Sequence, residues 1–408
     1  MRIKDCLIKR TPKGLRLRHA VSSYQVSMDD AALARLRDML SRGSVREMSG
    51  EERLIHDKLG RQGIVCADSD PAGRRELLVR ERSALESLEL EISGSCNLSC
   101  SHCFADLSQR MMNRETLDRV LQGVEELEPV SLILNGGEPL LNPLFREAVT
   151  QSRARGLRVV IMTNATLVTP EIAGFLAESR VAKLIVSLDF FQESHDSIRG
   201  AGAFEKTTAG IRLLAERKLA VFVTAMVQER TAALAGDFKR FCLEELGAAG
   251  VRFSAVLPIG KAAAGSPDLG ISDGTLRLLR RDGRLAEESM DQPAQKTGSG
   301  RFSCTAGIEQ CFIGADGKVY ACHYFQNLKE PMGDLRRSSL AEIHRAGSAA
   351  AITSRFDWGR LRTCGSCAAF AACRGGCRAR AKLLAGSYFA PDPFACRLHL
   401  PQAPGTIG

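Results

Sequence analysis

From about residue 86 the chain alternates short apolar strands with amphipathic helices, and this repeat restricts the possible folds more than any other feature. Apolar segments recur near 88–92, 131–135, 158–163, 183–189, 221–227 and 252–257. Helical patterns lie between them, near 114–127, 143–155, 170–179, 203–218 and 233–248. Such alternation builds βαβ units around a parallel sheet. Six units predict a partial (β/α)6 barrel of the α/β class, with functional residues at the carboxyl ends of its strands.

Three cysteines directly after the first of these strands indicate the chemistry. Cys96, Cys100 and Cys103 have the spacing Cys-x3-Cys-x2-Cys. Soft thiolates bind zinc or iron–sulfur clusters. A closed zinc site needs a fourth ligand, and His102 would have to fold back within the same loop to supply it. Three thiolates on a [4Fe–4S] cluster leave one iron open to a substrate or cofactor, and we favour this interpretation.

The cysteine spacing resembles that of the radical SAM superfamily, in which the open iron binds S-adenosylmethionine. The stretch Gly136-Gly137-Glu138-Pro139 matches the superfamily's GGEP element, which holds the methionine amino group. Any one of these short motifs alone would be an ordinary turn or helix cap, but their order along the chain favours the family. The resemblance implies that one electron cleaves the cofactor to methionine and a 5′-deoxyadenosyl radical, which abstracts hydrogen from a substrate. The cofactor-binding residues that it implies are Phe104, Gly136, Gly137, Glu138, Pro139, Thr163, Asn164, Ser187, Asp189 and Leu257.

A second group of cysteines lies in the C-terminal quarter of the chain and resembles the SPASM domain. By that resemblance, auxiliary cluster I is held by Cys304, Cys311, Cys322 and Cys377. Auxiliary cluster II is held by Cys364, Cys367, Cys373 and Cys396, so the chain would bind three [4Fe–4S] clusters. If Cys311 were a bystander, auxiliary cluster I would keep an open iron able to bind substrate. Two zinc-ribbon sites are the alternative, which the Cys-x2-Cys pair alone would permit.

The first 82 residues have a different pattern, of three short strands, two helices (29–40 and 50–59) and a wing strand. This pattern resembles the PqqD-like recognition element that captures leader peptides of ribosomally made natural products. The leader would add a strand to a basic sheet edge, with its acids meeting Arg10, Arg16 or Arg18. A DNA-binding winged helix is the alternative. Its helices would here mix acids with bases, which disfavours nucleic acid as a partner.

The composition agrees with a protein that binds metal rather than one held by disulfides. The 408 residues include fourteen cysteines, carry a net charge of +9 and are 44% hydrophobic. We find no long apolar run that would cross a membrane and no secretory signal, so we expect a cytoplasmic protein, where clustered cysteines bind metal. The expected divisions are a recognition domain (1–82), the barrel (86–260), a linker with one helix near 272–288 (261–300), the SPASM domain (301–400) and a tail (401–408).

SPASM domains accompany radical SAM enzymes that modify peptides and proteins, so the leading hypothesis is a peptide maturase. It would form a C–S (thioether) or C–C crosslink in a precursor peptide and draw electrons from a donor such as flavodoxin or ferredoxin. The alternatives are an anaerobic sulfatase-maturating enzyme, a peptide epimerase and a tetrapyrrole-modifying enzyme. The first of these is thought to use a carboxylate just after the third SPASM cysteine, where this chain has a histidine. The sequence does not single out the catalytic acid or base among Asp106, His102, Glu193, His195 and His323.

Overall fold

The computed structural model describes residues 85–105, 107, 109–264, 269–281, 304–350 and 360–400; before residue 85 it describes short strands and single helical positions. Six strands run in parallel through its centre, each paired with the next. They are β7 (Ser87–Ser93), β8 (Ser131–Gly136), β9 (Arg158–Thr163), β10 (Lys183–Ser187), β11 (Val221–Val227) and β12 (Gly250–Ala255). The partial parallel barrel that the strand–helix repeat predicts is therefore confirmed.

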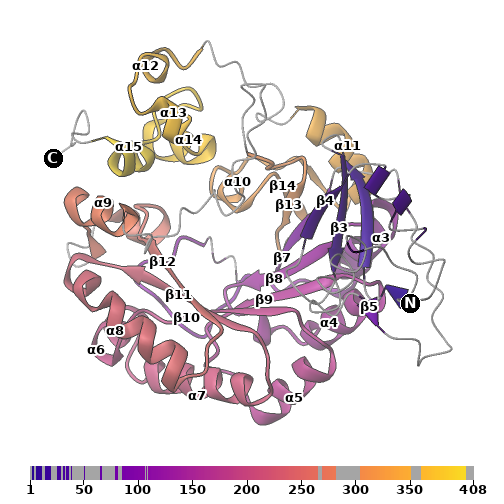
Figure 1. Ribbon diagram of the computed structural model, residues 1–408, viewed down its shortest axis with the longest axis horizontal. Coiled ribbons are helices and arrows are strands. Elements are labelled where there is room, and N and C mark those ends of the chain that lie inside the picture. Colours follow the sequence, from indigo (N-terminus) through magenta and orange to yellow (C-terminus); the bar gives the residue numbers. More distant parts are fainter. Residues whose placement is uncertain are drawn as a thin grey trace.

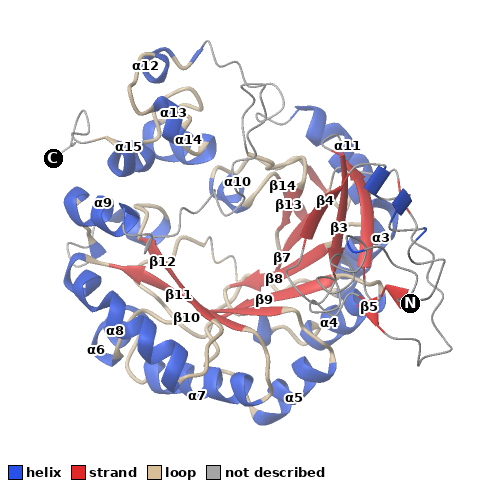
Figure 2. Cartoon of the chain, in the orientation of Figure 1, coloured by secondary structure: helices blue, strands red, loops and turns tan. Residues whose placement is uncertain are grey.

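The side chains of each strand alternate between two environments, as the two-residue period of a strand requires. On β7, Leu88 and Leu90 are fully buried against the helices, whereas Glu89 and Glu91 lie on the opposite face. The same alternation runs along β11, where every second residue from Val221 to Val227 is buried. We call the side that carries Glu89 and Glu91 the inner face, because Figure 2 shows the sheet curled around it with the helices outside.

The outer layer consists of helices whose apolar stripes cover the buried strand residues. Side-chain caps begin two of them: Asn113 accepts from the backbone N–H of Thr116, and Thr169 accepts from that of Ile172. The long helix expected over 233–248 is instead three short segments, and the helix Gln192–Arg199 was not predicted separately. The helices are α3 (Arg114–Leu127), α4 (Phe145–Ala154), α5 (Pro170–Glu178), α6 (Gln192–Arg199), α7 (Ala203–Glu216) and α8 (Ala235–Arg240), with short turns η2 (Pro139–Leu141), η3 (Glu229–Leu234), η4 (Phe241–Glu245) and η5 (Gly260–Ala264).

The C-terminal region continues the same sheet. Strand β13 (Gln310–Ile313) pairs in parallel with β7, and β14 (Lys318–Tyr320) and β15 (Gly333–Asp334) follow in antiparallel order, which makes a sheet of nine strands. The remaining helices are α9 (Asp273–Arg281), which lies in the predicted linker, and α10 (His323–Asn327), α11 (Leu340–Ala350), α12 (Arg362–Gly365), α13 (Phe370–Cys373), α14 (Arg378–Ala385) and α15 (Pro393–His399). Figure 1 shows β13 and β14 beside β7, and α15 beside α9.

A separate antiparallel sheet forms the N-terminal part. It contains β2 (Cys6–Thr11), β3 (Gly14–His19), β4 (Gln25–Met28) and β6 (Val79–Arg80) in the order β4-β3-β2-β6, while β1 (Arg2–Ile3) pairs with β5 (Val65–Cys66). The three predicted strands are present as a meander. Arg10, Arg16 and Arg18 lie on the inner strands β2 and β3, so the sheet edge is not the basic one expected; β4 and β6 form the edges. The predicted helices at 29–40 and 50–59 lie for the most part outside the described residues.

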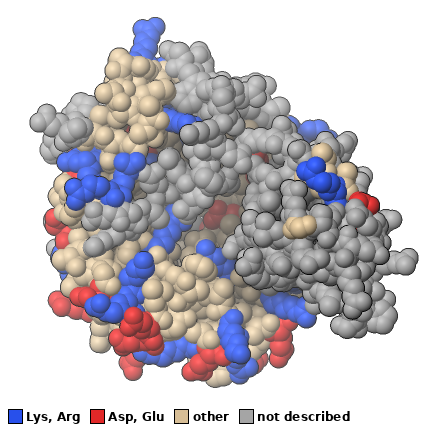
Figure 3. Space-filling model, viewed as in Figure 1, with Lys and Arg blue, Asp and Glu red and all other residues tan. Residues whose placement is uncertain are grey.

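Charged side chains are mixed over the surface of the barrel. On the face that Figure 3 shows, Lys and Arg lie among Asp and Glu along the lower rim, and a group of Lys and Arg lies at the left of the view. Within the part of the chain that the structure describes, no helix combines the length and the apolar character that crossing a membrane requires.

Candidate active site

The cysteine loop follows β7 at the edge where the carboxyl ends of all six parallel strands meet. Cys96, Cys100 and Cys103 form no disulfide. Burial raises the pKa of the Cys96 thiol, and the nearby charges of Cys100 and Cys103 raise it further. Burial also raises the pKa of the Cys100 thiol. Three thiols on one short loop are suited to a metal cluster, whose positive irons stabilise the thiolate form.

Backbone contacts from helix α6 and from the turn η5, which follows β12, hold this loop. The N–H of Ser101 donates to the Ile198 carbonyl at 3.0 Å, and the N–H of Lys261 donates to the Cys103 carbonyl at 2.9 Å. Gly260 has a φ of 64°, and a Cβ there would lie 2.6 Å from the Cys103 oxygen, so only glycine fits. Leu257, predicted to border adenine, is buried just before this contact.

The Gly136-Gly137 pair packs directly against the start of the cysteine loop. A Cβ on Gly136 would lie 2.1 Å from the Ser93 carbonyl oxygen, and one on Gly137 would lie 2.3 Å from that of Ser95. The N–H of Gly137 donates to Ser93 at 2.7 Å, and the N–H of Glu138 donates to Ser95 at 2.9 Å. Since these N–H groups are used within the chain, the carbonyl oxygens of the element are the groups suited to accept from an amine.

Glu138 is fully buried and ties the ends of β8 and β9 together. Its carboxylate accepts from the Thr163 hydroxyl at 2.8 Å and from the Asn164 N–H at 2.8 Å. Burial raises the pKa of Glu138 to about 7. The Asn164 side chain in turn donates to the Asn97 side chain at 2.9 Å, inside the cysteine loop. The predicted cofactor residues Glu138, Thr163 and Asn164 thus form a scaffold for the loop, and Pro139 begins the turn η2 beside them.

Asp189, also predicted to contact the cofactor, is the centre of a buried ionic network. It accepts from Arg199 Nε at 2.7 Å, from His102 Nε2 at 2.9 Å and from the Met226 N–H at 2.9 Å. Burial alone would raise its pKa, but Arg199 and His102 hold the pKa of Asp189 below its usual range. Arg199 Nη1 lies 3.7 Å from the Cys100 sulfur. The network therefore connects the end of β10 to a predicted cluster ligand through Arg199, which sequence reasoning missed.

The other predicted residues occupy several environments. His195 is buried, its Nδ1 accepts from the Asp189 N–H at 2.9 Å, and burial lowers its pKa to about 4, so it is neutral near pH 7. Ser187 is half-buried at the end of β10, and Glu193 is exposed on α6. Asp106 lies outside the described residues.

Glu89 and Glu91 lie on the inner face of β7 and were not predicted as site residues. The alternation within LELEI places both opposite the buried leucines. Glu91 accepts from the Ala315 N–H at 3.0 Å and from the Gln326 side chain at 2.9 Å. Burial raises the pKa of Glu91 to about 7. Glu89 accepts from the Asn135 amide and lies 3.7 Å from His323 Nδ1.

His323 brings the C-terminal region next to the cysteine loop. Its ring centroid lies 5.3 Å from that of Phe104, which follows Cys103 directly and is 41% exposed. The Tyr324 ring lies 4.3 Å from His323 and 6.4 Å from Phe104. Of the acid–base candidates in the sequence, His102 lies in the cysteine loop and is paired with the buried Asp189, whereas His323 has a carboxylate partner on the inner face and contacts Phe104.

The C-terminal cysteines form two groups. The nearby charges of Cys304 and Cys377 help to raise the pKa of Cys322, after burial. The charges of Cys364, Cys367 and Cys373 act in the same way on Cys396. No three His, Cys, Asp or Glu side chains among the described residues converge closely enough for a single metal ion, whereas a four-iron cluster holds its thiolates farther apart. Both groups supply the thiol donors that such a cluster needs.

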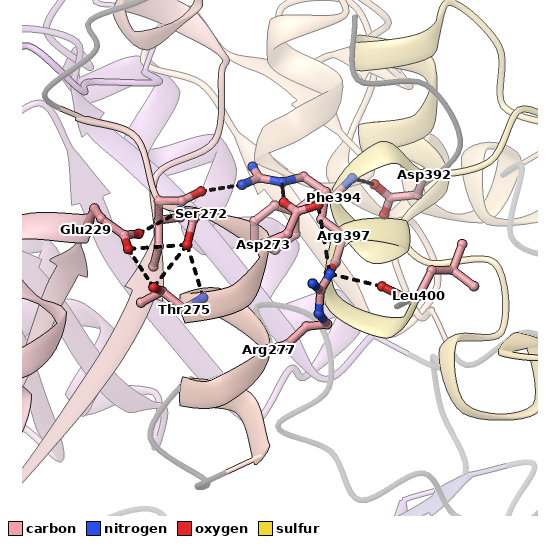
Figure 4. Close-up of polar contacts among 10 residues, drawn as sticks. Glu229, Ser272, Asp273, Thr275, Arg277, Asp392, Phe394, Arg397 and Leu400 are labelled. Atoms are coloured by element: carbon pink, nitrogen blue, oxygen red, sulfur yellow. Dashed lines mark hydrogen bonds and ion pairs between the residues drawn. The ribbon is translucent and has the colours of Figure 1, made fainter. Parts of the chain in front are cut away.

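A set of polar contacts between α15 and α9 attaches the second C-terminal cysteine group to the end of the barrel at β12 (Figure 4). We call this set the polar joint. Arg397, next to Cys396 on α15, donates to Asp273 on α9 at 2.6 Å. Arg277 donates to the Leu400 carbonyl at 3.0 Å. Glu229 anchors the start of α9 by accepting from the Ser272 N–H at 2.8 Å.

Comparisons with known proteins agree with this arrangement. Residues 90–229 match the model of the radical SAM superfamily, and residues 304–368 match that of the SPASM iron–sulfur cluster-binding domain. The AdoMet-dependent heme synthase of Methanosarcina barkeri is 32% identical over 338 residues, which cover 74% of this chain and 94% of that protein. The mycofactocin maturase MftC of Mycobacterium tuberculosis is 28% identical over 346 residues, covering 76% and 83%.

Among solved structures, the fold resembles that of Streptococcus suis SuiB bound to its precursor peptide SuiA. The TM-score is 0.71 at 16% identity, and the likeness covers 97% of this chain and 99% of SuiB. This likeness covers more of the chain than the two family matches, which begin at residue 90 and leave the N-terminal residues out. Taken with the cysteine loop and its glycine-rich neighbour, these findings show that the chain belongs to the radical SAM superfamily, as an enzyme with a SPASM domain that uses [4Fe–4S] clusters and S-adenosylmethionine.

Proposed function

We propose that this enzyme matures a ribosomally synthesised precursor peptide by forming an intramolecular thioether or C–C crosslink. The observation that carries the proposal is the N-terminal sheet, which accompanies the barrel and leaves β4 as an edge strand. An edge strand has unpaired backbone groups to which an extended peptide adds by β-augmentation. The relatedness to a mycofactocin maturase, over 76% of this chain, supports a peptide substrate.

We assign the cluster and cofactor residues as follows. Cys96, Cys100 and Cys103 hold the cluster that binds S-adenosylmethionine, and the Gly136-Gly137 carbonyls meet its amino group. Cys364, Cys367, Cys373 and Cys396 hold an auxiliary cluster, and Cys304, Cys322 and Cys377 belong to another, for which Cys311, buried on β13, is the predicted fourth ligand. When bound, the first cluster supplies the electron that cleaves the cofactor to methionine and a 5′-deoxyadenosyl radical.

The reaction balances with S-adenosylmethionine as the consumed oxidant, which would end as methionine and 5′-deoxyadenosine after a peptide carbon gives up a hydrogen atom. A peptide thiol would bond to that carbon and lose its proton to a base, and one electron would leave to an auxiliary cluster and return to the first cluster. The protein's part is to orient the peptide and to accept the proton. The Glu89–His323 pair is our candidate for proton transfer, because it lies on the inner face beside Phe104.

An anaerobic assay tests this function. The reconstituted enzyme is incubated with S-adenosylmethionine, a reductant (flavodoxin, ferredoxin or dithionite) and the small peptide encoded beside its gene. We expect the peptide mass to fall by about two hydrogens, and this loss to persist after thiol alkylation. Unchanged mass with inverted stereochemistry would instead show an epimerase, and an aldehyde at a Cys or Ser would show formylglycine formation.

The recognition role of the N-terminal part has its own test. Removal of residues 1–82 should abolish binding of a fluorescent leader peptide while the barrel keeps its iron. Substitution of Val26 in β4 by proline, which takes one N–H out of the edge strand, should weaken binding without removing the domain. Full leader affinity after the deletion would show that recognition occurs elsewhere.

A second candidate function follows from one specific observation. The heme synthase relative is more identical to this chain, at 32%, than the maturase is. We therefore include a tetrapyrrole substrate in the same assay. Formation of heme, seen by its absorbance, together with no change in any peptide would replace the peptide function by this one.

A further inference from the structure

The segment 360–400, which carries the second C-terminal cysteine group, has charges of almost one sign. It includes seven lysines and arginines and a single acid, Asp392. The Asp392 side chain is buried and bonded to Arg380 at 2.6 Å. The one negative charge of this segment is therefore neutralised inside the fold, and the charge that the segment presents to solvent is positive.

Three arginines of this segment lie around one buried leucine. Leu361 is 2% exposed, and a Cβ on Gly375 would lie 3.2 Å from Leu361 Cδ1. Arg360 and Arg362 are the chain neighbours of Leu361. Arg374 is the chain neighbour of Gly375, so this contact brings the three arginines together. Arg360 and Arg362 are exposed, and Arg374 is half-buried. We call these three residues the arginine surface.

The thiols of the same cysteine group lie close to the molecular surface. Cys367 and Cys373 are only half-buried, and Arg374 follows Cys373 directly. Electron transfer between proteins becomes slower as the two redox groups are separated further, and nothing bulky separates this group from solvent. The exposed residues between Cys364 and Cys373 all have small side chains: they are Gly365, Ser366, Ala368, Ala371 and Ala372. Figure 1 shows their helices α12 and α13 at the periphery of the molecule.

We propose that the arginine surface is the docking site of an acidic one-electron carrier protein, which exchanges an electron with the cluster held by the second C-terminal cysteine group. Arginine suits this role because its planar guanidinium pairs with a carboxylate through two parallel hydrogen bonds. The Arg360 guanidinium stacks on the Phe389 ring at 3.6 Å, so it is held in place before a partner arrives. Interfaces of electron carriers are small and weak, and complementary charge gives them speed and orientation.

The exchange moves one electron and nothing else. The reduced carrier is oxidised by one electron and the cluster is reduced by one, while no bond forms or breaks in this chain. The inference rests on the proposed assignment of a cluster to this cysteine group, and it is independent of the substrate. The acidic part of a leader peptide is the competing occupant of the same charges.

Stopped-flow electron transfer tests the docking site. The parent protein is the full-length chain in which the cysteines of the first cluster are replaced: Cys96→Ala, Cys100→Ala and Cys103→Ala. It is reduced with dithionite, freed of excess reductant and mixed with oxidised flavodoxin, an acidic carrier. Transfer through one docking site is reversible, so the appearance of flavin semiquinone reports on the site in both directions. Cys367→Ala, which removes a ligand of the nearby cluster, should abolish the fast phase.

Reversal of the three charges should slow this transfer. In the triple variant Arg360→Glu, Arg362→Glu and Arg374→Glu we expect the second-order rate constant to fall by about 10- to 100-fold at low salt. A higher ionic strength should slow the parent and should not slow the variant, because salt screens attraction and repulsion alike. The matched control reverses three exposed arginines on barrel helices and should keep the parent rate; its changes are Arg146→Glu, Arg212→Glu and Arg240→Glu.

Iron content separates docking from damage to the cluster. The triple variant should keep its iron and its full reduction by dithionite, a small ion that needs no docking site. If charge reversal costs iron, the milder variant Arg360→Gln, Arg362→Gln and Arg374→Gln replaces it. A parent rate in a variant that keeps its iron would overturn the proposal, as would a fast phase that survives Cys367→Ala. Parent-like transfer together with weakened binding of a fluorescent leader peptide would assign the surface to the peptide instead. Since the transfer is measured without a peptide, failure of the peptide assay alone rejects the proposed function and leaves the docking site standing.

Discussion

The Asp189 carboxylate is fully buried and accepts three hydrogen bonds, from Arg199, from His102 and from the Met226 backbone N–H. A buried cation without its partner is costly, because the attraction that offsets its lost hydration is gone. Asp189 therefore keeps Arg199 charged and in place beside Cys100. It is a positioning residue, which acts on the cysteine loop through the arginine.

The variant Asp189→Asn should lower the free energy of unfolding by about 3–5 kcal/mol, since it leaves Arg199 buried without a counter-charge. The control His102→Gln keeps a donor toward Asp189 and should cost only about 1 kcal/mol. Anaerobic urea unfolding measures both. Equal losses in the two variants would show that the ion pair with Arg199 is not the dominant contact.

Glu91 makes stability depend on pH in an unusual direction for a carboxylate. Burial raises its pKa from 4.5 to about 7. Between these values the folded state holds a proton that the unfolded state has released, so the contribution of Glu91 to stability is full below pH 4.5 and is lost as the pH rises to about 7. Glu138 has a similar shift, for the same reason. Each carboxylate contributes a loss on the order of 3 kcal/mol across this range.

Replacement of Glu91 by Gln should therefore remove a decline on the order of 3 kcal/mol from the unfolding free energy between about pH 4.5 and 7, and Glu138→Gln should remove a similar one. Urea unfolding at intervals across this range provides the measurement. The matched control is Glu89→Gln, which removes a carboxylate from the same face of β7. A Glu91→Gln slope as steep as that of the wild type would refute the assignment.

At the scale of elements, helix α3 of the barrel packs against α11 of the C-terminal region at a glycine. A Cβ on Gly123 would lie 2.5 Å from Leu340 Cβ and 2.7 Å from Leu340 Cδ2. Because Gly123 has no side chain, α3 and α11 can lie closer together than two helices with larger residues at their contact. Gly236 on α8 offers a comparison, since nothing lies within 4 Å of its Cβ position.

These two glycines predict opposite effects of the same substitution. Gly123→Ala should destabilise the protein by about 1–3 kcal/mol, because the new methyl group forces α11 away from α3. Gly236→Ala should stabilise it by up to about 1 kcal/mol, because alanine favours a helix and meets no obstacle. Thermal unfolding of both variants compares them directly. Stabilisation by Gly123→Ala would mean that the two helices are not in close contact.

At the scale of the whole molecule, local patterns predicted the strands, most helices and the cysteine loop, because each depends on residues near one another in sequence. The alternation in LELEI is also sufficient to predict that Glu89 and Glu91 lie on the inner face, opposite the buried leucines. The pairing of β13 with β7 joins residues more than 200 positions apart, and no local pattern encodes it. The Asp189–Arg199 pair joins residues only ten positions apart, but this pair and the burial of Cys311 both depend on which face each element turns inward.

The C-terminal region is attached to the partial barrel at both ends. At one end β13 extends the sheet from β7, and at the other α15 docks on α9, which follows β12 (Figure 1). The second attachment rests on Arg397, which is half-buried and bonded to Asp273 and to the Ile271 carbonyl. Since Cys396 precedes Arg397, this joint also orients a thiol of the second C-terminal group.

Loss of the joint should therefore free α15 without disturbing β13. In Arg397→Gln and Asp273→Asn we expect faster hydrogen exchange across Pro393–His399, unchanged exchange across Gln310–Ile313, and partial loss of one cluster's iron. The double variant should cost less than the sum of the two single variants, because the same charged hydrogen bond is removed in each. Arg240→Ala, which breaks an exposed ion pair with Asp237, should leave all three readouts unchanged. If α15 kept its protection in both single variants, packing against α9 rather than the ion pair would be what holds this end of the molecule.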